Sequence, residues 1–215
     1  MIDVQKQRDT RNIDINKVGV KGIRYPIVVL DRANKTQPTV ATVSMFVDLP
    51  HHFKGTHMSR FIEILDKYRG EMTVNNMPDI LQEMKEKLEA ETAHVELDFP
   101  YFIEKEAPVS RARSLMDYRC WFIGSIQSEM DFVMGAQVPV TSLCPCSKEI
   151  SRFGAHNQRS HITVQVRYRE FVWLEELIET VERCGSCELY PLLKRDDEKY
   201  VTEHAYLNPV FVEDI

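Results

Sequence analysis

The chain has 215 residues, of which 43% are hydrophobic, enough apolar material to bury the core of one large domain or two small ones. The formal net charge of -6 argues against a nucleic-acid-binding surface, and the apolar runs are too short to cross a bilayer. The charged N-terminus and the odd number of five cysteines predict a cytoplasmic protein with free thiols rather than a disulfide framework.

The first predicted elements are two strands and two helices. Residues 18–30 are rich in Val, Ile and Tyr, and residues 39–47 repeat that pattern after a polar turn. This arrangement predicts a β-hairpin. Residues 56–68 and 78–91 place apolar side chains at helical spacing, and the second of these ranges starts with Pro78. We therefore expect two amphipathic helices after the hairpin.

Two extended stretches follow, at residues 93–104 and 118–133, so the first half of the chain has the order ββααββ. The second half begins this order again, with two predicted strands and two predicted helices at residues 136–140, 161–168, 172–183 and 196–205. The repeated order predicts an α+β fold of two tandem ββααββ units with antiparallel sheets, at residues 1–132 and 133–215.

The second predicted unit is incomplete. Asn208 and Pro209 have the character of a helix cap and a first helical residue, and the two closing strands of the repeat are absent from this sequence. Because an antiparallel sheet with helices on one face leaves open edges, we expect the units to pair with each other or with other subunits. The expected protein is a homo-oligomer.

The segment Cys144-Pro145-Cys146 is the first candidate for chemistry. Two thiols around a proline at the end of a predicted strand favour an exposed, rigid loop that holds a metal or a nucleophile, although both cysteines could also be small apolar side chains. His156, in the next polar loop, is a candidate imidazole ligand. His161, at the start of the following strand, is expected to pair with the backbone or to lie outside the ligand set.

A second cysteine pair offers a different interpretation. Cys184 and Cys187 form a C-x-x-C motif, and with the first pair they could build a four-thiolate structural zinc module. A chain with ample apolar residues does not need such a metal to fold. We expect instead that the motif ends the helix at residues 172–183, with Gly185 as its cap.

Two further segments mix charge and polarity. Residues 54–60 place cations, hydroxyls and a glycine at a helix start, which suits a phosphate but also an ordinary capped helix. Residues 192–204 mix acids and bases densely, which is typical of a solvated helix face.

Five motifs in order resemble the type IB GTP cyclohydrolase family, and they lie at residues 52–61, 144–148, 156–161, 192–203 and 208–213. Agreement across several motifs is far more specific than any one of them, and it covers nearly the whole chain. The resemblance implies a tunnelling fold of two ββααββ units per chain, a homotetramer, and GTP as the substrate.

The resemblance also implies a metal site. By matching positions, Cys144, His156 and Glu198 are the expected ligands of a divalent metal, which could be zinc, manganese or ferrous iron, with a position left open for water. Cys146 is expected to stand beside the metal. Glu213 is similar to the glutamate that anchors the amino and ring N–H groups of a purine or pterin.

The implied reaction is water attack at C8 of guanine, loss of formate and formation of 7,8-dihydroneopterin triphosphate for folate synthesis. Cys144, Cys146 and His161 are the expected catalytic residues, the last two as general acid and base. The triphosphate is expected to contact some of the residues Lys54, His57, Ser59, Arg60, Lys148 and Arg159.

This sequence departs from the family pattern at one point, and one alternative function within the same fold stays open. The family pattern continues beyond Ile215 with a further active-site histidine, which this sequence lacks. A related nitrile reductase of queuosine synthesis shares the fold and the anchoring glutamate but uses a cysteine nucleophile, and it would consume NADPH without a metal.

Overall fold

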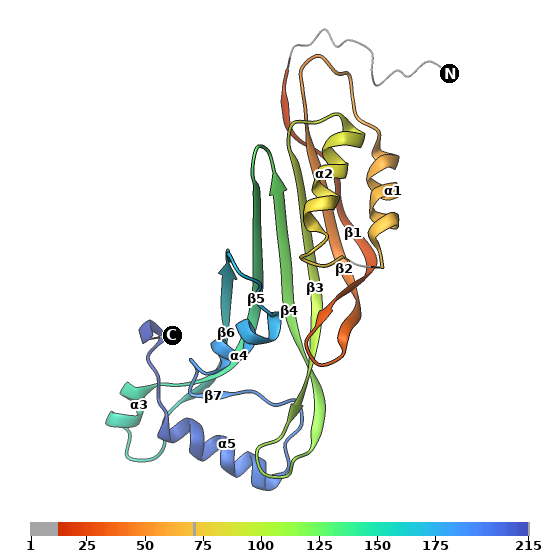
Figure 1. Cartoon of the computed structure of the whole chain (residues 1–215). Coiled ribbons are helices and arrows are strands. Elements are labelled where there is room, and N and C mark those ends of the chain that lie inside the picture. The colour runs from red at the N-terminus through yellow and green to blue at the C-terminus, as the bar shows by residue number, and fades with distance from the viewer. Residues whose placement is uncertain (1–12, 71, 215) are drawn as a thin grey trace. The chain divides into compact units, whose positions relative to one another are not determined.

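The computed structural model describes residues 13–70 and 72–214 and shows an α+β fold with antiparallel strands (Figure 1). Among those residues, the strands follow the order β1-β2-β3-β4-β5-β6, and the short strand β7 pairs with β5. No helix in the described residues is both long and apolar enough to cross a membrane. The charged segment of residues 1–12, used above for the cytoplasmic prediction, lies outside the described residues.

The first of two compact units contains the described residues up to Phe99, together with Trp121–Met134 and Val166–Arg169. Its elements, some shared with the second unit, are β1 Ile15–Asp31, β2 Lys35–Leu49, α1 Met58–Tyr68, α2 Met77–Leu88, β3 Ala93–Glu106, β4 Arg113–Ile126 and β5 Met130–Leu143. The predicted hairpin and both predicted amphipathic helices are confirmed.

The β1–β2 hairpin closes through the side chain of Asp31. Its Oδ1 accepts hydrogen bonds from the backbone N–H groups of Ala33 at 2.9 Å and Asn34 at 2.6 Å. Lys35 adopts a left-handed φ of 71°, which lets the chain reverse. The turn therefore fixes a register in which Asp31 pairs with Lys35.

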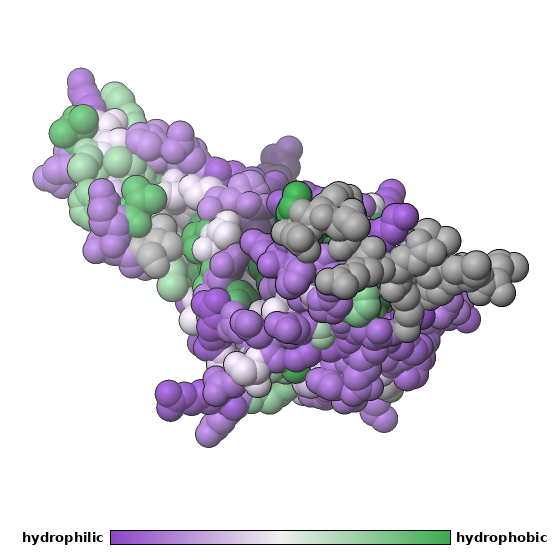
Figure 2. Space-filling model, turned by 90° about the horizontal axis from the view of Figure 1, so that it is seen from above, coloured by the Kyte–Doolittle hydropathy of each residue, from purple (hydrophilic) through white to green (hydrophobic). Residues whose placement is uncertain are grey.

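Both helices of this unit bury one face. Three residues of α1 and five of α2 are buried, namely Phe61, Ile64, Leu65, Met77, Ile80, Leu81, Met84 and Leu88. Gly124 of β4 permits close packing, because a Cβ there would lie 2.7 Å from Cγ of Met77. The face of the molecule seen in Figure 2 is mainly hydrophilic, as expected when helices turn their apolar sides inward.

Glu83 joins the two helices. Its carboxylate lies 2.6 Å from Nζ of Lys67 and 2.8 Å from Nζ of Lys87, and it accepts a 2.8 Å hydrogen bond from the hydroxyl of Tyr68. Partial burial by itself raises the pKa of Glu83, but these three donors outweigh it and lower the pKa from 4.5 to about 2. The ionised carboxylate thus stabilises the folded state.

Replacing Glu83 by glutamine is expected to lower the free energy of unfolding by about 1 kcal/mol near neutral pH. The folded-state pKa is depressed, so the stabilisation is present above about 4.5 and is lost as the pH falls towards about 2. Urea unfolding followed by Trp121 fluorescence at several pH values checks this. Glu86→Gln, on the same helix, is the control, and a pH-independent difference for Glu83→Gln would contradict the assignment.

The second compact unit contains Pro100–Cys120, Gly135–Gln165 and the described residues from Glu170 onward. Besides its parts of β3, β4 and β5, it has the elements α3 Pro145–Ile150, β6 Asn157–Val166, α4 Leu174–Glu182, β7 Cys187–Glu188, α5 Arg195–Leu207 and the 3₁₀-helix η1 Val212–Asp214. Because β3, β4 and β5 enter both units, the compact units are not contiguous halves. The tandem repeat at residues 1–132 and 133–215 stays a prediction.

Two sequence predictions in this region had wrong bounds, and one helix was missed. Residues 118–133 are not one extended stretch, because the chain turns at residues 127–129, where the N–H of Gln127 donates to the carbonyl of Glu129 at 3.3 Å. The predicted strand at 136–140 is the inner part of β5. The six-residue helix α3 was not predicted. The turn contains neither glycine nor proline, so composition gave no signal for it.

A buried ionic cluster ties the elements of this unit together. Nζ of Lys105 lies 2.8 Å from Oε1 of Glu182 and 2.6 Å from Oε2 of Glu188. The hydroxyl of Tyr118 donates to the same oxygen of Glu182 at 2.6 Å, and the ring of Tyr190 lies 4.9 Å from Nζ of Lys105. Burial raises the pKa of Tyr118, which keeps it a donor. The cluster links β3, β4, α4 and β7.

Candidate functional site

Cys144 lies at the junction between β5 and α3. It is the residue before the first turn of α3, where Pro145 takes the first helical position. Hydrogen bonds from Ser147, first through its backbone N–H, and from Cys146 outweigh the effect of burial and lower the pKa of Cys144. The thiol is partly exposed. These features make Cys144 a better thiolate ligand or nucleophile than an ordinary cysteine.

The structure brings His156 next to this cysteine. The backbone N–H of Cys144 donates to the carbonyl of His156 at 3.2 Å, and the N–H of His156 donates to Oγ of Ser147 at 3.1 Å. His156 is exposed and lies in the loop directly before β6. The backbones of the two predicted ligand residues are therefore neighbours, although the residues are twelve positions apart in the sequence.

The third predicted ligand, Glu198, lies in the first turn of α5 and is exposed. In the described part of the chain, no three His, Cys, Asp or Glu side chains are gathered closely enough to hold a metal ion. The structure thus joins the backbones of two predicted ligands and places the third, Glu198, on a different element, α5. The donor types of the three residues nevertheless suit zinc, manganese or ferrous iron.

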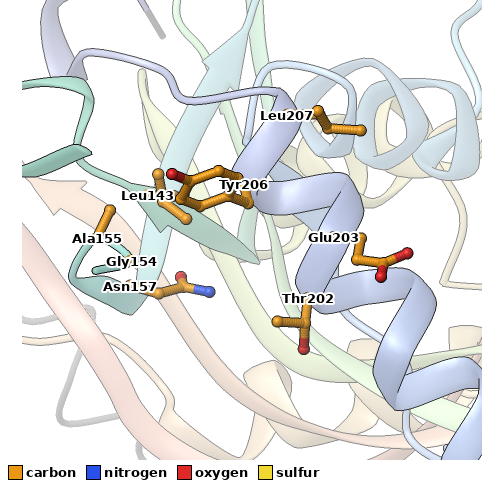
Figure 3. A pocket seen from close by; sticks show the side chains of 8 residues that line it. All are labelled: Leu143, Gly154, Ala155, Asn157, Thr202, Glu203, Tyr206 and Leu207. Atoms are coloured by element: carbon orange, nitrogen blue, oxygen red, sulfur yellow. The ribbon is translucent and has the colours of Figure 1, made fainter. Parts of the chain in front are cut away.

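A cavity of about 440 Å³ lies beside the Cys144–His156 pair (Figure 3). One wall is formed by α5, and the other by the end of β5 and the loop before β6. The lining residues are Leu143, Gly154, Ala155, Asn157, Thr202, Glu203, Tyr206 and Leu207. Glu198 lies one helical turn before Thr202, whose Oγ1 donates to the carbonyl of Glu198 at 2.7 Å. It lines an adjoining hollow that shares Thr202 and Glu203.

Cys146 and His161, the other predicted catalytic residues, differ in their placement. Cys146 is exposed on α3 and contributes a hydrogen bond to the Cys144 thiol. His161 is exposed in the middle of β6 rather than at its start. It lies four positions after Asn157 in the strand, which is about 13 Å along the chain. Cys146 is therefore close to Cys144, whereas His161 is not.

The residues predicted to contact the triphosphate are divided between the two units. Lys54, His57, Ser59 and Arg60 belong to the first unit, and Lys148 and Arg159 belong to the second. Lys148 is already engaged: Nζ donates to the carbonyl of Tyr206 at 2.6 Å and lies 4.3 Å from the centre of its ring. The guanidinium of Arg60 donates to the carbonyl of Lys87.

Glu213 is exposed in the 3₁₀-helix near the end of the described chain. Its segment is attached to the site, because the N–H of Val210 donates to the carbonyl of Leu143 at 3.3 Å. Leu143 directly precedes Cys144. The predicted purine-anchoring motif therefore begins beside the strand end that carries the predicted metal ligand.

The second cysteine pair lies in a different environment. Cys187 is buried against Leu143 and Ala205, and burial raises its pKa to about 11. Sγ of Cys184 donates to the carbonyl of Thr180 at 3.4 Å. A protonated, buried thiol is a poor zinc ligand. Within the described residues, these thiols form no metal cluster with the first pair.

The predicted role of Gly185 was wrong. The helix α4 ends at Glu182, with Arg183 as its right-handed cap, and Gly185 does not have a positive φ. A Cβ at Gly185 would lie 2.7 Å from Cβ of Val140, so the glycine is needed for close packing against β5.

Sequence reasoning also missed Asp197, which is completely buried at the start of α5. The surrounding segment is so rich in charge that it resembled a solvated helix face. The available signal was an acidic residue in the first turn of a predicted helix, which is typical of N-terminal capping.

Comparison with known proteins places the whole chain in one family. Residues 1–215 match the family described as type I GTP cyclohydrolase folE2. The GTP cyclohydrolase FolE2 of Geobacter metallireducens is 66% identical over 215 residues, which cover all of this chain and 82% of that protein. The FolE2 protein of Geobacter sulfurreducens is 67% identical, with coverage of 100% and 83%.

Among solved structures, a uricase from Arthrobacter globiformis aligns with a TM-score of 0.48 and 11% identity, covering 88% of this chain and 75% of that chain. A thermostable uricase mutant aligns with a TM-score of 0.49 and 13% identity, covering 78% and 65%.

Proposed function

Because this chain belongs to the type I GTP cyclohydrolase FolE2 family, it is a GTP cyclohydrolase, and we propose that Cys144, His156 and Glu198 hold the divalent metal of its reaction. The reaction opens the guanine ring of GTP at C8, releases formate and gives 7,8-dihydroneopterin triphosphate. The observation that supports the ligand set is the backbone hydrogen bond that joins Cys144, whose thiol has a lowered pKa, to His156. The match of residues 1–215 to this family confirms the resemblance seen in the sequence.

A divalent metal bound at these residues would supply Lewis acidity that activates water for attack on C8. The chain's own residues would do the rest. Cys146, next but one to Cys144, would move a proton during ring opening, and His161, farther along β6, would take a lesser part. Exclusion of water would fall to the apolar side chains around the cavity, such as Leu143 and Tyr206.

Glu213 would bind the guanine base. A carboxylate accepts two parallel hydrogen bonds from the amino group and ring N–H of guanine, and the Val210–Leu143 bond holds this segment beside the site. The triphosphate would contact some of the predicted cations, among them Lys54, Arg60 and Arg159. Lys148 would keep one donor of its ammonium on the carbonyl of Tyr206 while another contacts a phosphate.

We further propose the tunnelling fold, with units at residues 1–132 and 133–215, assembled as a cytoplasmic homotetramer. The supporting feature is β6, which ends the strand order and contains no buried residue, so it offers an open edge to a further strand or subunit. All five cysteines are free, which suits the cytoplasm. The net charge of -6 gives no support to nucleic acid as a partner.

Metal removal tests the proposed function. We expect the protein loaded with zinc, manganese or ferrous iron to release formate from GTP and to form a pterin that fluoresces after oxidation. Chelation should abolish both products, and returning the metal should restore them. Metal-independent NADPH oxidation with a nitrile substrate would support the reductase alternative instead. A folded, metal-loaded protein that leaves GTP intact would refute the assigned reaction.

A further inference from the structure

Asp197 precedes Glu198 in α5 and is fully buried although it is a carboxylate. Its Oδ1 accepts hydrogen bonds from the N–H groups of Val109 at 2.9 Å and Ser110 at 2.8 Å. Its Oδ2 accepts hydrogen bonds from Oγ of Ser110 at 2.6 Å and from the N–H of Lys194 at 2.9 Å. Burying a carboxylate is costly unless it is hydrogen-bonded in this way.

The partner of Asp197 is the turn between β3 and β4, which is itself well fixed. The N–H of Ala107 donates to the carbonyl of Ala112 at 2.9 Å, and the N–H of Ala112 donates to Oγ of Ser110 at 3.3 Å. Arg111 adopts a left-handed φ of 58°. Asp197 therefore attaches the start of α5 to a closed, hydrogen-bonded turn rather than to a loose loop.

A second contact fixes the rotation of α5 about its axis. Ala205 is fully buried and, with Val201, packs against Leu143 and Cys187. Asp197, Val201 and Ala205 are spaced by four residues and form one stripe of the helix. The helix is thus anchored at its first turn and again two turns later.

The neighbouring stripe of α5 carries Glu198, Thr202 and Tyr206. Thr202 and Tyr206 line the cavity whose opposite wall includes Ala155 and Asn157, the residues on either side of His156 (Figure 3). Anchoring the first stripe therefore turns the second towards the Cys144–His156 side. A one-residue rotation of the helix would carry Glu198 about 100° away.

We propose that Asp197 is a positioning residue that keeps Glu198 on the stripe of α5 that faces the Cys144–His156 side, from which its side chain can reach a bound metal. This inference rests on the proposed ligand set of Cys144, His156 and Glu198. Asp197 itself touches neither metal nor substrate. It acts by fixing α5 to the β3–β4 turn, so that Glu198 does not have to be ordered each time a metal binds.

The test measures metal affinity rather than turnover. Zn²⁺ affinity is obtained by competition with a chromophoric chelator, and Co²⁺ binding is followed by its visible and thiolate charge-transfer absorption. Asp197→Ala is expected to weaken Zn²⁺ binding by about 10- to 100-fold and to change the Co²⁺ spectrum. Ser110→Ala, which removes one of the four hydrogen bonds to Asp197, should give a smaller loss in the same direction and leave α5 folded.

Glu176→Ala is the matched control. Glu176 accepts a hydrogen bond from the N–H of Trp173 at 3.2 Å and so caps α4 as Asp197 caps α5. Both variants should lower the melting temperature, but only Asp197→Ala should weaken metal binding. Equal Zn²⁺ affinities for the two variants and the parent would overturn the inference, since Asp197 would then have only a structural role.

A double variant separates this inference from the proposed function. If Asp197 acts through Glu198, then Asp197→Ala should cause no further loss of Zn²⁺ affinity in a Glu198→Ala background. Additive losses of Zn²⁺ affinity in the double variant would overturn the inference about Asp197 but not the proposed ligand set. An unchanged affinity in Glu198→Ala by itself would remove Glu198 from the ligand set and overturn both proposals.

Discussion

Replacing Cys144 by alanine is expected to lower metal-dependent GTP turnover by at least about 1000-fold. The thiol is the predicted ligand whose pKa is lowered and whose backbone is bonded to His156, so its loss removes a ligand and the negative charge that it brings. A metal contributes several kcal/mol to such a reaction, and about 4 kcal/mol corresponds to a factor of about 1000. Formate release and bound zinc per chain are the quantities to measure.

Cys184→Ala is the control for this prediction. Cys184 is also a partly exposed thiol of the second unit, but it donates to the carbonyl of Thr180 and lies outside the proposed site. The Cys184→Ala variant should therefore keep its bound zinc and its rate of GTP turnover. If the two alanine variants had similar activity, Cys144 would not hold the catalytic metal. The zinc content of both variants would then test the four-thiolate hypothesis, which requires Cys144 and Cys184 alike.

Replacing Lys105 by methionine is expected to destabilise the protein by about 3–5 kcal/mol, because it removes one partner of a buried ionic cluster. The Lys105 side chain is 8% exposed and the Glu182 side chain 9% exposed. Without the ammonium, Glu182 keeps only the hydroxyl of Tyr118 among its described partners, and its negative charge is left buried. The loss therefore reflects an uncompensated charge more than the lost attraction.

Urea unfolding of the second unit measures this effect. Trp173 lies in that unit and Trp121 in the first, so a Trp121→Phe background leaves Trp173 as the reporter. Lys199→Met is the matched control, because Lys199 pairs with Glu203 at 4.0 Å on an exposed helix face and should contribute less than about 1 kcal/mol. Adding Glu182→Gln to Lys105→Met should recover part of the stability. Equal losses for the two methionine variants would contradict the buried-charge argument.

Much of the secondary structure could be predicted from local pattern. The β1–β2 hairpin, α1, α2 and α4 follow from apolar periodicity bounded by polar turns, because one buried face dictates the spacing. The helix α5 was predicted as well, but from a charge-rich segment. The prediction failed where local pattern carries no signal. The turn at residues 127–129 lacks glycine and proline, and α3 is too short for periodicity to be seen.

The candidate site was predictable in part. Its residue types came from motifs, and the family assignment that the motifs supported is confirmed over residues 1–215. The motifs gave no distances. The structure joins the backbones of His156 and Cys144 by a hydrogen bond, and Lys148 donates to the carbonyl of Tyr206 near the end of α5. In the described residues, Glu198 does not complete a group of three ligating side chains with them.

The sequence by itself determined the elements, the family and the kinds of ligand, since these depend on residue type and short-range spacing. Only the tertiary structure decided which distant groups meet. Asp197 is buried because Ser110, 87 residues earlier, turns its donors towards it, and the Glu213 segment reaches the site through the bond from Val210 to Leu143. Such pairings satisfy buried polar groups across the fold, and no local periodicity records them.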